Sequence, residues 1–392
     1  MGQTFIPAVF YRGGTSKGVF FHARDLPAER EACDPILLAA LGSPDPYGRQ
    51  LNGMGGGISS LSKAVIIGPP TRPDADVDYT FIQLAVDEVV ADWTNNCGNL
   101  SSAVGHFAVD EGLIRARDGE TLVRIHQTNT KKIIHSRFLV ANGKAETDGD
   151  FVIAGVAGTG ARIRLDFLSP DGAVTGRLLP TGNSVDTVDL GGDGHFEISI
   201  VDATSPIAYV DAASLGLIGS ESPDQIEAQP KVMDTLEKLR RCAGVMMGLA
   251  SRPDQVGLQT PRMAMVAKPA AFTSLDGQAY KAEDFDIGTR MMSMQRAHRA
   301  IPGTGGLNLG VATQVPGTIP NRLSRPANAA GEVRVANPSG LVSVGAVVRQ
   351  AGNEWTADSA VLFRTARRLM QGEIAVPTSA MAHSETKLRR YG

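Results

Sequence analysis

The sequence predicts an α+β fold made of two pseudo-equivalent domains, each with a curled, mostly antiparallel sheet around one central helix. Two observations carry this prediction. A strand–turn–strand pattern occurs twice, and a small-residue turn leading into an amphipathic helix also occurs twice. A chain of 392 residues is long enough for two domains of ordinary size.

The first repeated unit is a pair of strands joined by a tight turn. Near the start it reads IPAVFYRGGTSKGVFFHARDLP, and around residue 200 it reads FEISIVDATSPIAYVDAASLGL. Both have a turn of small or polar residues between two apolar runs rich in β-branched and aromatic residues, which is typical of a β-hairpin. A short turn containing leucine follows each of them.

The second repeated unit places small residues before a helix. It reads DWTNNCGNLSSAVGHFAVDEG in the first half and RAIPGTGGLNLGVATQVPGT in the second. Matching the glycines sets Thr304 opposite Cys97 and Gly305 opposite Gly98. Alternating strands, such as 78–90, 121–127 and 162–168, lie between the paired units.

The changeover between the halves is expected near LLPTGNSVDTVDL, which gives domains 1–185 and 186–392. A charged helix over about 224–249 is an insertion in the second half. Two helix N-termini directed at one interdomain cleft would favour a ligand with at least two carboxylates. We therefore expect the active site in that cleft.

Composition narrows the class of protein. Apolar residues make up 42% and charged residues 20%, as in globular proteins, and a net charge of -3 gives no sign of nucleic-acid binding. No apolar run reaches membrane-spanning length and the start lacks signal-peptide features. The three widely spaced cysteines, without CxxC, favour a reducing cytoplasm. We expect a small-molecule partner and neither nucleic acid nor membrane.

The histidines give no metal-binding pattern. None of the seven forms HxxH or HExxH, and no carboxylate cluster has ligand spacing, so no catalytic metal is expected. His106 and His298 stand in apolar, helix-like contexts and are expected to be packed. A GxSxG elbow for serine hydrolysis is absent from the sequence.

Cys97 stands just before a predicted helix, where free N–H groups and the helix dipole favour a thiolate and a bound anion. This makes it a candidate acid/base or nucleophile. An ordinary half-buried thiol explains the same pattern, and the stretch alone leaves both readings open.

Two glycine-rich stretches resemble nucleotide loops without matching them. RGGTSKG lacks the Walker spacing, yet Thr15 and Ser16 could bind an anion, and Arg12 could be a carboxylate partner or solvated. LNGMGGGISSLSK fails the dinucleotide pattern but delivers Ser62 and Lys63 into a strand. In a cleft poor in water, a lysine there could act as a base near neutral pH; otherwise it flanks the strand as a charged residue.

At RGGTSKG, SPDPYGRQLNGMGGGISSLSK, NCGNLSSAVG, LPTGN and PGTGG, the sequence resembles the PrpF family, which has the diaminopimelate-epimerase-like fold. The family includes 2-methylaconitate isomerase, aconitate and methylitaconate Δ-isomerases and 4-oxalomesaconate tautomerase. The resemblance implies a site without cofactor between two similar domains. It also implies that Lys63 moves the proton alongside Cys97.

Two departures from related patterns bear on the reaction. Diaminopimelate epimerase uses one cysteine from each half, whereas Thr304 holds the second position here, and its hydroxyl does no acid/base work at neutral pH. Symmetric racemisation is therefore disfavoured. The family often has an acidic residue where this chain has Asn52, and GMGGGISSLSK resembles the methylaconitate and aconitate branch, which favours a tricarboxylate.

The predicted function is a cofactor-independent cis-trans or allylic isomerase of small unsaturated tricarboxylates, with Lys63 and Cys97 as catalytic residues. Alternatives are a 4-oxalomesaconate tautomerase or Δ-isomerase of aromatic catabolism, an amino-acid epimerase, and a non-catalytic metabolite-binding accessory protein. A homodimer is an assembly that the sequence leaves open. The predicted substrate-binding residues are Arg12, Thr15, Ser16, Ser62, Gly98, Asn99, Leu100, Thr304, Gly305 and Gly306.

Overall fold

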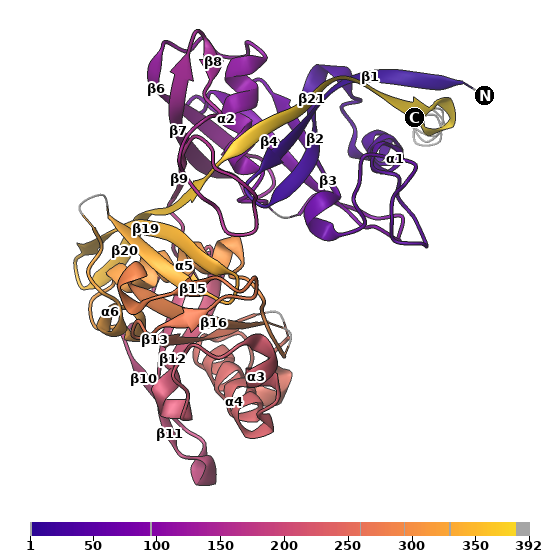
Figure 1. The fold of residues 1–392 in the computed structure, drawn as a ribbon. Helices are drawn as coiled ribbons and strands as arrows, with labels where there is room; N and C mark the ends of the chain where they lie inside the picture. The colour runs from indigo at the N-terminus through magenta and orange to yellow at the C-terminus, as the bar shows by residue number, and fades with distance from the viewer. Residues whose placement is uncertain (1, 95, 259, 294, 329–330, 382–392) are drawn as a thin grey trace. The chain divides into compact units, whose positions relative to one another are not determined.

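The computed structural model describes residues 2–94, 96–258, 260–293, 295–328 and 331–381. The chain forms two compact units, Met1–Leu165 with Arg364–Gly392, and Asp166–Phe363. The predicted division at residue 185 is thus placed differently, inside strand β9 (Ile163–Leu168). The chain also returns to the first unit, because β21 (Ala366–Pro377) pairs antiparallel with the first strand from Gln3 to Gly13 (Figure 1).

The first unit is a sheet with the strand order β21–β1–β2–β3–β4–β6–β7–β9. The pairs β2–β3 and β4–β6 are parallel, whereas β1–β21, β1–β2, β3–β4 and β6–β7 are antiparallel. Its strands are β1 (Gln3–Gly13), β2 (Ser16–His22), β3 (Lys63–Gly68), β4 (Val77–Leu84), β5 (Ala91–Asp92), β6 (Gly119–Gln127), β7 (Lys132–Ala141), β8 (Lys144–Ala145), β9 and β21.

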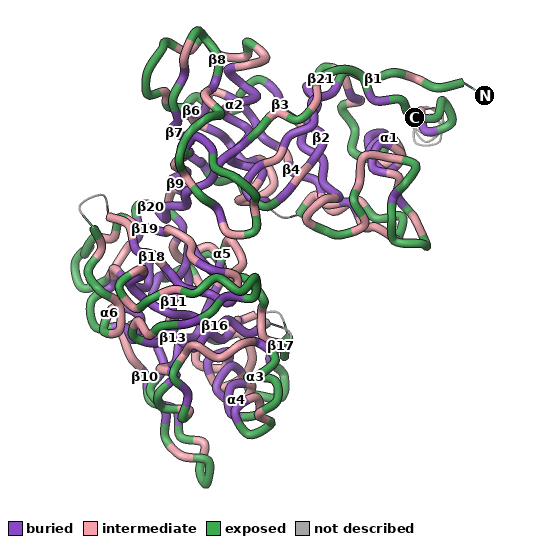
Figure 2. Tube along the Cα trace, viewed as in Figure 1, coloured by how far each residue is buried: buried purple, intermediate pink, exposed green. Residues whose placement is uncertain are grey.

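Helix α2 (Ser101–Asp110) lies against this sheet and is buried from Ser101 to Val109 (Figure 2). A helix with small or apolar residues on all sides is suited to such a central position. The ring of Phe107 contacts those of Tyr11 and Phe20, with centroids 6.4 and 5.8 Å apart. The other helix of this unit, α1 (Arg30–Leu41), buries an apolar face that includes Ile36. The predicted sheet around a central helix is confirmed for this half.

The second unit repeats the same topology, with the strand order β10–β11–β12–β13–β16–β18–β19–β20. As in the first unit, the second strand of the hairpin, β12, runs parallel to the next strand, β13. The pair β16–β18 is also parallel. This correspondence confirms the predicted duplication, and β21 fills in the first unit the place that β10 fills in the second. Its strands are β10 (Asp186–Asp189), β11 (His195–Ala203), β12 (Ser205–Asp211), β13 (Arg262–Ala267), β14 (Phe272–Thr273), β15 (Ala279–Tyr280), β16 (Ile287–Ser293), β17 (Arg296–Ala297), β18 (Glu332–Asn337), β19 (Gly340–Ala351) and β20 (Glu354–Arg364).

Helix α5 (Gly303–Gln314) is the buried central helix of the second unit (Figure 2). Asn308 ties it to the β11–β12 hairpin, because its Nδ2 donates to three backbone carbonyls there and its Oδ1 accepts from the Tyr209 hydroxyl. Gly310 lets the helix approach the sheet, since a Cβ there would lie 2.8 Å from the backbone oxygen of Gly345. The short helix α6 (Ile319–Leu323) follows.

The predicted insertion over 224–249 is confirmed as two helices, α3 (Pro223–Glu227) and α4 (Pro230–Met246). The break falls at Pro230, whose missing N–H suits the first position of a helix. The apolar face of α4 is buried through Leu236 and Leu239, while its other side carries the charges. Within the described part of the chain, no helix combines the length and apolarity needed to span a membrane.

Candidate active site

In the first unit, three segments of the predicted site lie side by side. They are the tip of the β1–β2 hairpin, the first residue of β3, and the turn that leads into α2. We call this the first junction, and it comprises Gly13–Ser16, Gly18, Lys63 and Cys97–Leu100. The sequence segments that form it are far apart, and the parallel pairing of β2 with β3 brings two of them together.

Glycines of RGGTSKG allow this close approach. A Cβ at Gly13 would lie 2.7 Å from the backbone oxygen of Asn99, and one at Gly18 would lie 2.8 Å from the backbone oxygen of Lys63 and 2.9 Å from Leu100 Cδ1. Gly14 also has φ +52°, a left-handed conformation that favours glycine. The hairpin backbone therefore packs directly on the start of β3 and on the turn before α2.

Asn99 connects the hairpin tip to a buried cation. Its Nδ2 donates to Thr15 Oγ1 at 3.0 Å and to Ser16 Oγ at 3.4 Å. Its Oδ1 accepts from Nε of Arg364 at 2.9 Å. Arg364 is buried, and burial lowers its pKa to about 10, while nearby Cys97 acts in the opposite direction. The structure therefore brings Thr15, Ser16 and Asn99 together and adds an arginine that sequence reasoning missed.

Cys97 is buried, with 9% of its surface exposed, and stands one turn before α2. The Leu100 N–H points toward its sulfur at 3.5 Å, as expected for a thiol at a helix start. Its backbone oxygen accepts hydrogen bonds from the hydroxyls of Ser101, at 2.9 Å, and Tyr79, at 3.3 Å. These contacts hold the thiol at the N-terminal end of the central helix.

Lys63 is 8% exposed at the start of β3, and its Nζ is held by two groups on β4. It donates to Oε1 of Gln83, which lies directly opposite in the antiparallel ladder, and it lies 5.0 Å from the ring centroid of Phe81. Gln83 is oriented for this contact because its Nε2 donates to the backbone oxygens of Ser59 and Ser62. Sequence reasoning missed Gln83, and only the strand register reveals it.

Lys63 and Cys97 share one face of the β3–β4 pair. Residues two apart on a strand point to the same side, so Tyr79, Phe81 and Gln83 lie on one face of β4. Tyr79 contacts the backbone of Cys97, while Phe81 and Gln83 contact Lys63. The two predicted catalytic residues therefore both contact this face of β4.

Two predicted binding residues have structural partners instead. The buried Ser62 hydroxyl donates to Gln50 Oε1 at 2.6 Å and to the Ile58 backbone oxygen at 2.8 Å, which closes the glycine-rich loop. Arg12 Nη1 donates to the backbone oxygens of Gly14 and Thr365, both at 3.0 Å. Both side chains support the backbone around the first junction.

The second unit has the corresponding arrangement, which we call the second junction: the hairpin tip Ala203–Ser205, Arg262, and Thr304–Gly306. The Thr204 hydroxyl donates to the backbone oxygen of Thr304 at 3.0 Å. Nη1 of Arg262, the first residue of β13, donates to Thr304 Oγ1 at 2.9 Å. A Cβ at Gly305 would lie 2.7 Å from the Met291 side chain, so this glycine lets the first turn of α5 pack on β16.

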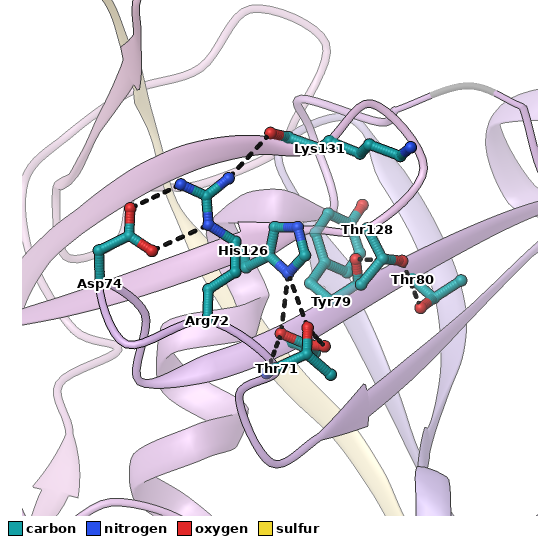
Figure 3. A network of polar contacts seen from close by, with 9 residues as sticks. Thr71, Arg72, Asp74, Tyr79, Thr80, His126, Thr128 and Lys131 are labelled. Carbon is teal, nitrogen blue, oxygen red and sulfur yellow. Dashed lines mark hydrogen bonds and ion pairs between the residues drawn. The ribbon is translucent and has the colours of Figure 1, made fainter.

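Two histidines, His126 and His106, have surroundings that do not suit them to acid/base catalysis. Figure 3 shows His126, whose Nδ1 lies 3.0 Å from Asp78 Oδ1 and 3.3 Å from Thr71 Oγ1. Because both partners share one ring nitrogen, this cluster is no relay from carboxylate through histidine to hydroxyl. Burial lowers the pKa of His106 to about 3, with the charge of Arg12 adding to it. His106 is therefore packed and neutral, as expected.

Two cavities in the described structure are lined by none of the predicted site residues. One of about 250 Å³ lies between α4 and β13 and is lined by Met233, Met263 and Met292 among others. Another of about 650 Å³ is formed by the loop that includes Tyr47 and Asn52. Within the described ranges, no group of three or more His, Cys, Asp or Glu side chains is arranged to hold a metal ion.

This duplicated fold also occurs in solved and curated isomerases. A 3-methylitaconate isomerase from Eubacterium barkeri is 39% identical, covering 95% of this chain and 98% of its own. A 2-methyl-aconitate isomerase from Shewanella oneidensis is 39% identical, covering 96% and 98%. The crystal structure of a methylitaconate-delta-isomerase superposes with a TM-score of 0.90 at 38% identity, covering 97% of this chain and 98% of that one.

The family model described as PrpF protein matches residues 3–377. The chain belongs to the PrpF family, and it is an isomerase. The family predicted from RGGTSKG, NCGN and PGTGG is thereby confirmed, with the duplicated α+β fold.

Proposed function

We propose that the chain is a cofactor-independent isomerase of small unsaturated tricarboxylates of the 2-methylaconitate or aconitate type. The observation that carries the proposal is the first junction, where an enclosed lysine and a cysteine at a helix start share one face of the sheet. The named activities of the relatives, on methylitaconate and 2-methyl-aconitate, support the substrate class.

In this proposal, Lys63 removes a proton from an allylic carbon. The electrons of that C–H bond form a dienolate that extends from the double bond to a carboxylate, and the proton moves to Nζ. Returning a proton to the other end of the dienolate shifts the double bond, and rotation before its return exchanges cis and trans forms. Gln83 and Phe81 support this role because they hold Nζ in one position.

Cys97 acts as a second acid/base group or orients the substrate. The amides of Gly98 and Asn99 hold a carboxylate and the charge that develops in the dienolate, with the Thr15 and Ser16 hydroxyls beside them. In the second unit, the amides of Gly305 and Gly306 at the start of α5 are likewise suited to a carboxylate. Leu100 fills the space against Gly18 and keeps the turn in place.

Arg12 and Ser62 keep a supporting role in the proposal. Each stabilises backbone that carries a substrate-contacting residue, Arg12 at the hairpin tip and Ser62 next to Lys63. We also infer a reducing, cytoplasmic setting, which is supported by the three cysteines, all of them unpaired in the structure.

The test is proton NMR in D₂O with trans-aconitate, 2-methylaconitate and 4-oxalomesaconate as separate substrates. We expect isomerisation with deuterium incorporation for one of the first two acids. Turnover of oxalomesaconate alone would assign the chain to the tautomerase branch. No exchange with any of the three, at protein concentrations that bind them, would favour the accessory-protein alternative.

A further inference from the structure

The glycine-rich loop before Lys63 contains a glutamine, Gln50, in a conformation that is uncommon for its residue type. Its φ is +53°, in the left-handed region that favours glycine, and only 1% of the residue is exposed. The carboxylate of Asp45 holds the backbone there, because its Oδ2 accepts from the N–H groups of Gln50, at 2.6 Å, and Arg49, at 3.0 Å. Strained backbone of this kind persists where the surrounding structure requires it, and it is concentrated at functional sites.

Two glycines of GMGGGISS leave room for the Gln50 side chain. A Cβ at Gly55 would lie 2.3 Å from Cδ of Gln50, which is far inside van der Waals contact. Gly57 has φ +74°, and a Cβ there would lie 2.2 Å from the backbone oxygen of Gly48. Glycine at both positions therefore lets the loop close around the Gln50 amide. This gives the stretch, which matches no nucleotide-binding pattern, a role inside the protein.

The Gln50 amide joins the two ends of this loop. Its Nε2 donates to Ser43 Oγ at 2.8 Å, near the start of the loop. Its Oε1 accepts from the Gly57 N–H at 2.9 Å and from Ser62 Oγ at 2.6 Å, toward the end. Ser43 and Ser62 are both buried, so water does not compete for these bonds. The amide therefore fixes the position of Ser62 relative to the rest of the loop.

Ser62 passes this constraint to the proposed base. It directly precedes Lys63, and its backbone oxygen accepts from Nε2 of Gln83 at 2.9 Å. The oxygen of the same Gln83 amide accepts from Nζ of Lys63. A displaced Ser62 would therefore move both the backbone of Lys63 and the group that holds its Nζ. A continuous path of hydrogen bonds thus leads from the Gln50 amide to the lysine.

We propose that Gln50 is a positioning residue for Lys63, acting through Ser62 and Gln83. This inference rests on the proposed role of Lys63 as the base and deepens it. A base must be held close to the proton that it removes, and a displacement of about 1 Å can lower a rate about 100-fold. The stretch GMGGG has four glycines in five residues and would be flexible by itself. The Gln50 amide supplies the rigidity that this stretch lacks.

The experiment measures kcat, KM and solvent-deuterium exchange with the acid that the unaltered chain isomerises, in Gln50→Met, Gln83→Ala and the double variant. Methionine keeps the length of the side chain and the left-handed φ but has no amide. We expect Gln50→Met to lower kcat roughly 10- to 100-fold and to change KM less than about threefold, because the base moves while the substrate-binding groups do not. Since Gln50 acts through Gln83, kcat of the double variant should lie within about threefold of that of the slower single variant.

Two glycine variants separate positioning from folding. Gln50→Gly removes the amide and relieves the backbone, so kcat should fall as in Gln50→Met while Tm changes differently. Lys131→Gly is the matched control, because Lys131 has φ +57° but is exposed in the turn after β6. It should keep the kcat of the unaltered chain.

Three results would overturn the inference. One is full kcat in Gln50→Met. The second is a double variant in which the two losses multiply, which would mean that the two glutamines act independently. The third is loss of folding in both Gln50 variants, or kcat and KM that change in step with Tm, which would assign Gln50 to the fold alone. Absence of turnover and of exchange in the unaltered chain is a different result, since it would overturn the proposed function together with the inference.

Discussion

The two junctions have the same backbone frame but different chemistry. The first has a lysine and a cysteine, residue types that serve as general acids and bases in enzymes, whereas the second has Arg262 and Thr304 at the corresponding places. Strand order, parallel pairing and the central helix are repeated in both units. The comparison indicates that the two units keep the same backbone positions while the side chains at those positions differ.

The hairpin tips differ in how closely they approach. At the first junction, Gly13 and Gly18 leave no room for a side chain beside the backbone of Asn99 and Lys63. At the second, the position equivalent to Gly18 is Ile207, which is fully buried. The tighter first junction encloses the lysine, which is consistent with a site where water must be excluded during proton transfer.

The largest expected effect is that of Lys63→Ala. Removing the proposed base should lower kcat on the order of 10²- to 10⁴-fold and abolish solvent-deuterium exchange, with Kd for trans-aconitate largely kept. Lys17→Ala is the matched control, since Lys17 lies over the Phe10 ring, on the other side of β2 from Gly18. Solvent-deuterium exchange at the unaltered rate in Lys63→Ala would show that Lys63 is not the base.

Cys97→Ser should have a partial effect. The serine hydroxyl keeps its proton through the working range, so one acid/base contributor is lost and kcat should fall roughly ten- to a thousand-fold. Binding should change little because the helix amides remain. Alkylation of Cys97 should be slowed by bound trans-aconitate. The control is Cys242→Ser, which should keep the activity of the unaltered chain because Cys242 is half-buried in α4, outside the first junction. Full activity with unprotected alkylation would place the thiol outside the site.

Gln83→Glu tests how Lys63 is held. A carboxylate in place of the amide oxygen would favour the ammonium form, so the rising limb of the pH–rate profile should move up by about 1–3 units. The variant also loses amide donors to Ser59 and Ser62, which should lower Tm. Recovery of activity at high pH separates the charge effect from misfolding. A uniform loss at every pH would argue that Gln83 only supports the loop.

The smallest effect is expected for Thr304→Ala. The hydroxyl accepts from Arg262, and Thr304 is a predicted substrate-binding residue, so its loss should raise Kd for trans-aconitate roughly 2- to 10-fold, as for one hydrogen bond. Proton transfer should slow less than binding weakens. A loss of turnover like that of Lys63→Ala at unchanged Kd would mean that the second junction takes part in the chemistry.

Local patterns were sufficient for much of the fold. The two hairpins, the two small-residue turns before buried helices and the inserted helices all have short-range signals, and each is present in the structure. The prediction that Cys97 and Thr304 occupy equivalent places rested on matched glycines. The repeated strand order supports this match, because Cys97 lies just before the central helix of the first unit and Thr304 lies in the first turn of that of the second.

Long-range pairing explains what the sequence did not reveal. The contacts divide the chain inside β9 instead of at 185. Nothing in β21 itself indicates that its partner is β1, so the return of the chain to the first unit was not predicted. Arg364, Arg262 and Gln83 stand at or near strand ends without a motif. Gln83 contacts the residue opposite it in the ladder, and the two arginines contact the start of the central helix of their unit. Such residues become visible only when register is known.

The pairing of β21 with β1 has a consequence for the order in which the molecule can be completed during synthesis. The second unit is one continuous segment, so all its strands leave the ribosome before β21 does. The first unit waits, with one flank of β1 unpaired from Gln3 to Gly13, until the last strand is made. Arg364, which contacts Asn99, is the last residue of β20 and lies just before that strand in the chain. The first junction therefore gains its buried cation only when the rest of the chain has already had time to fold.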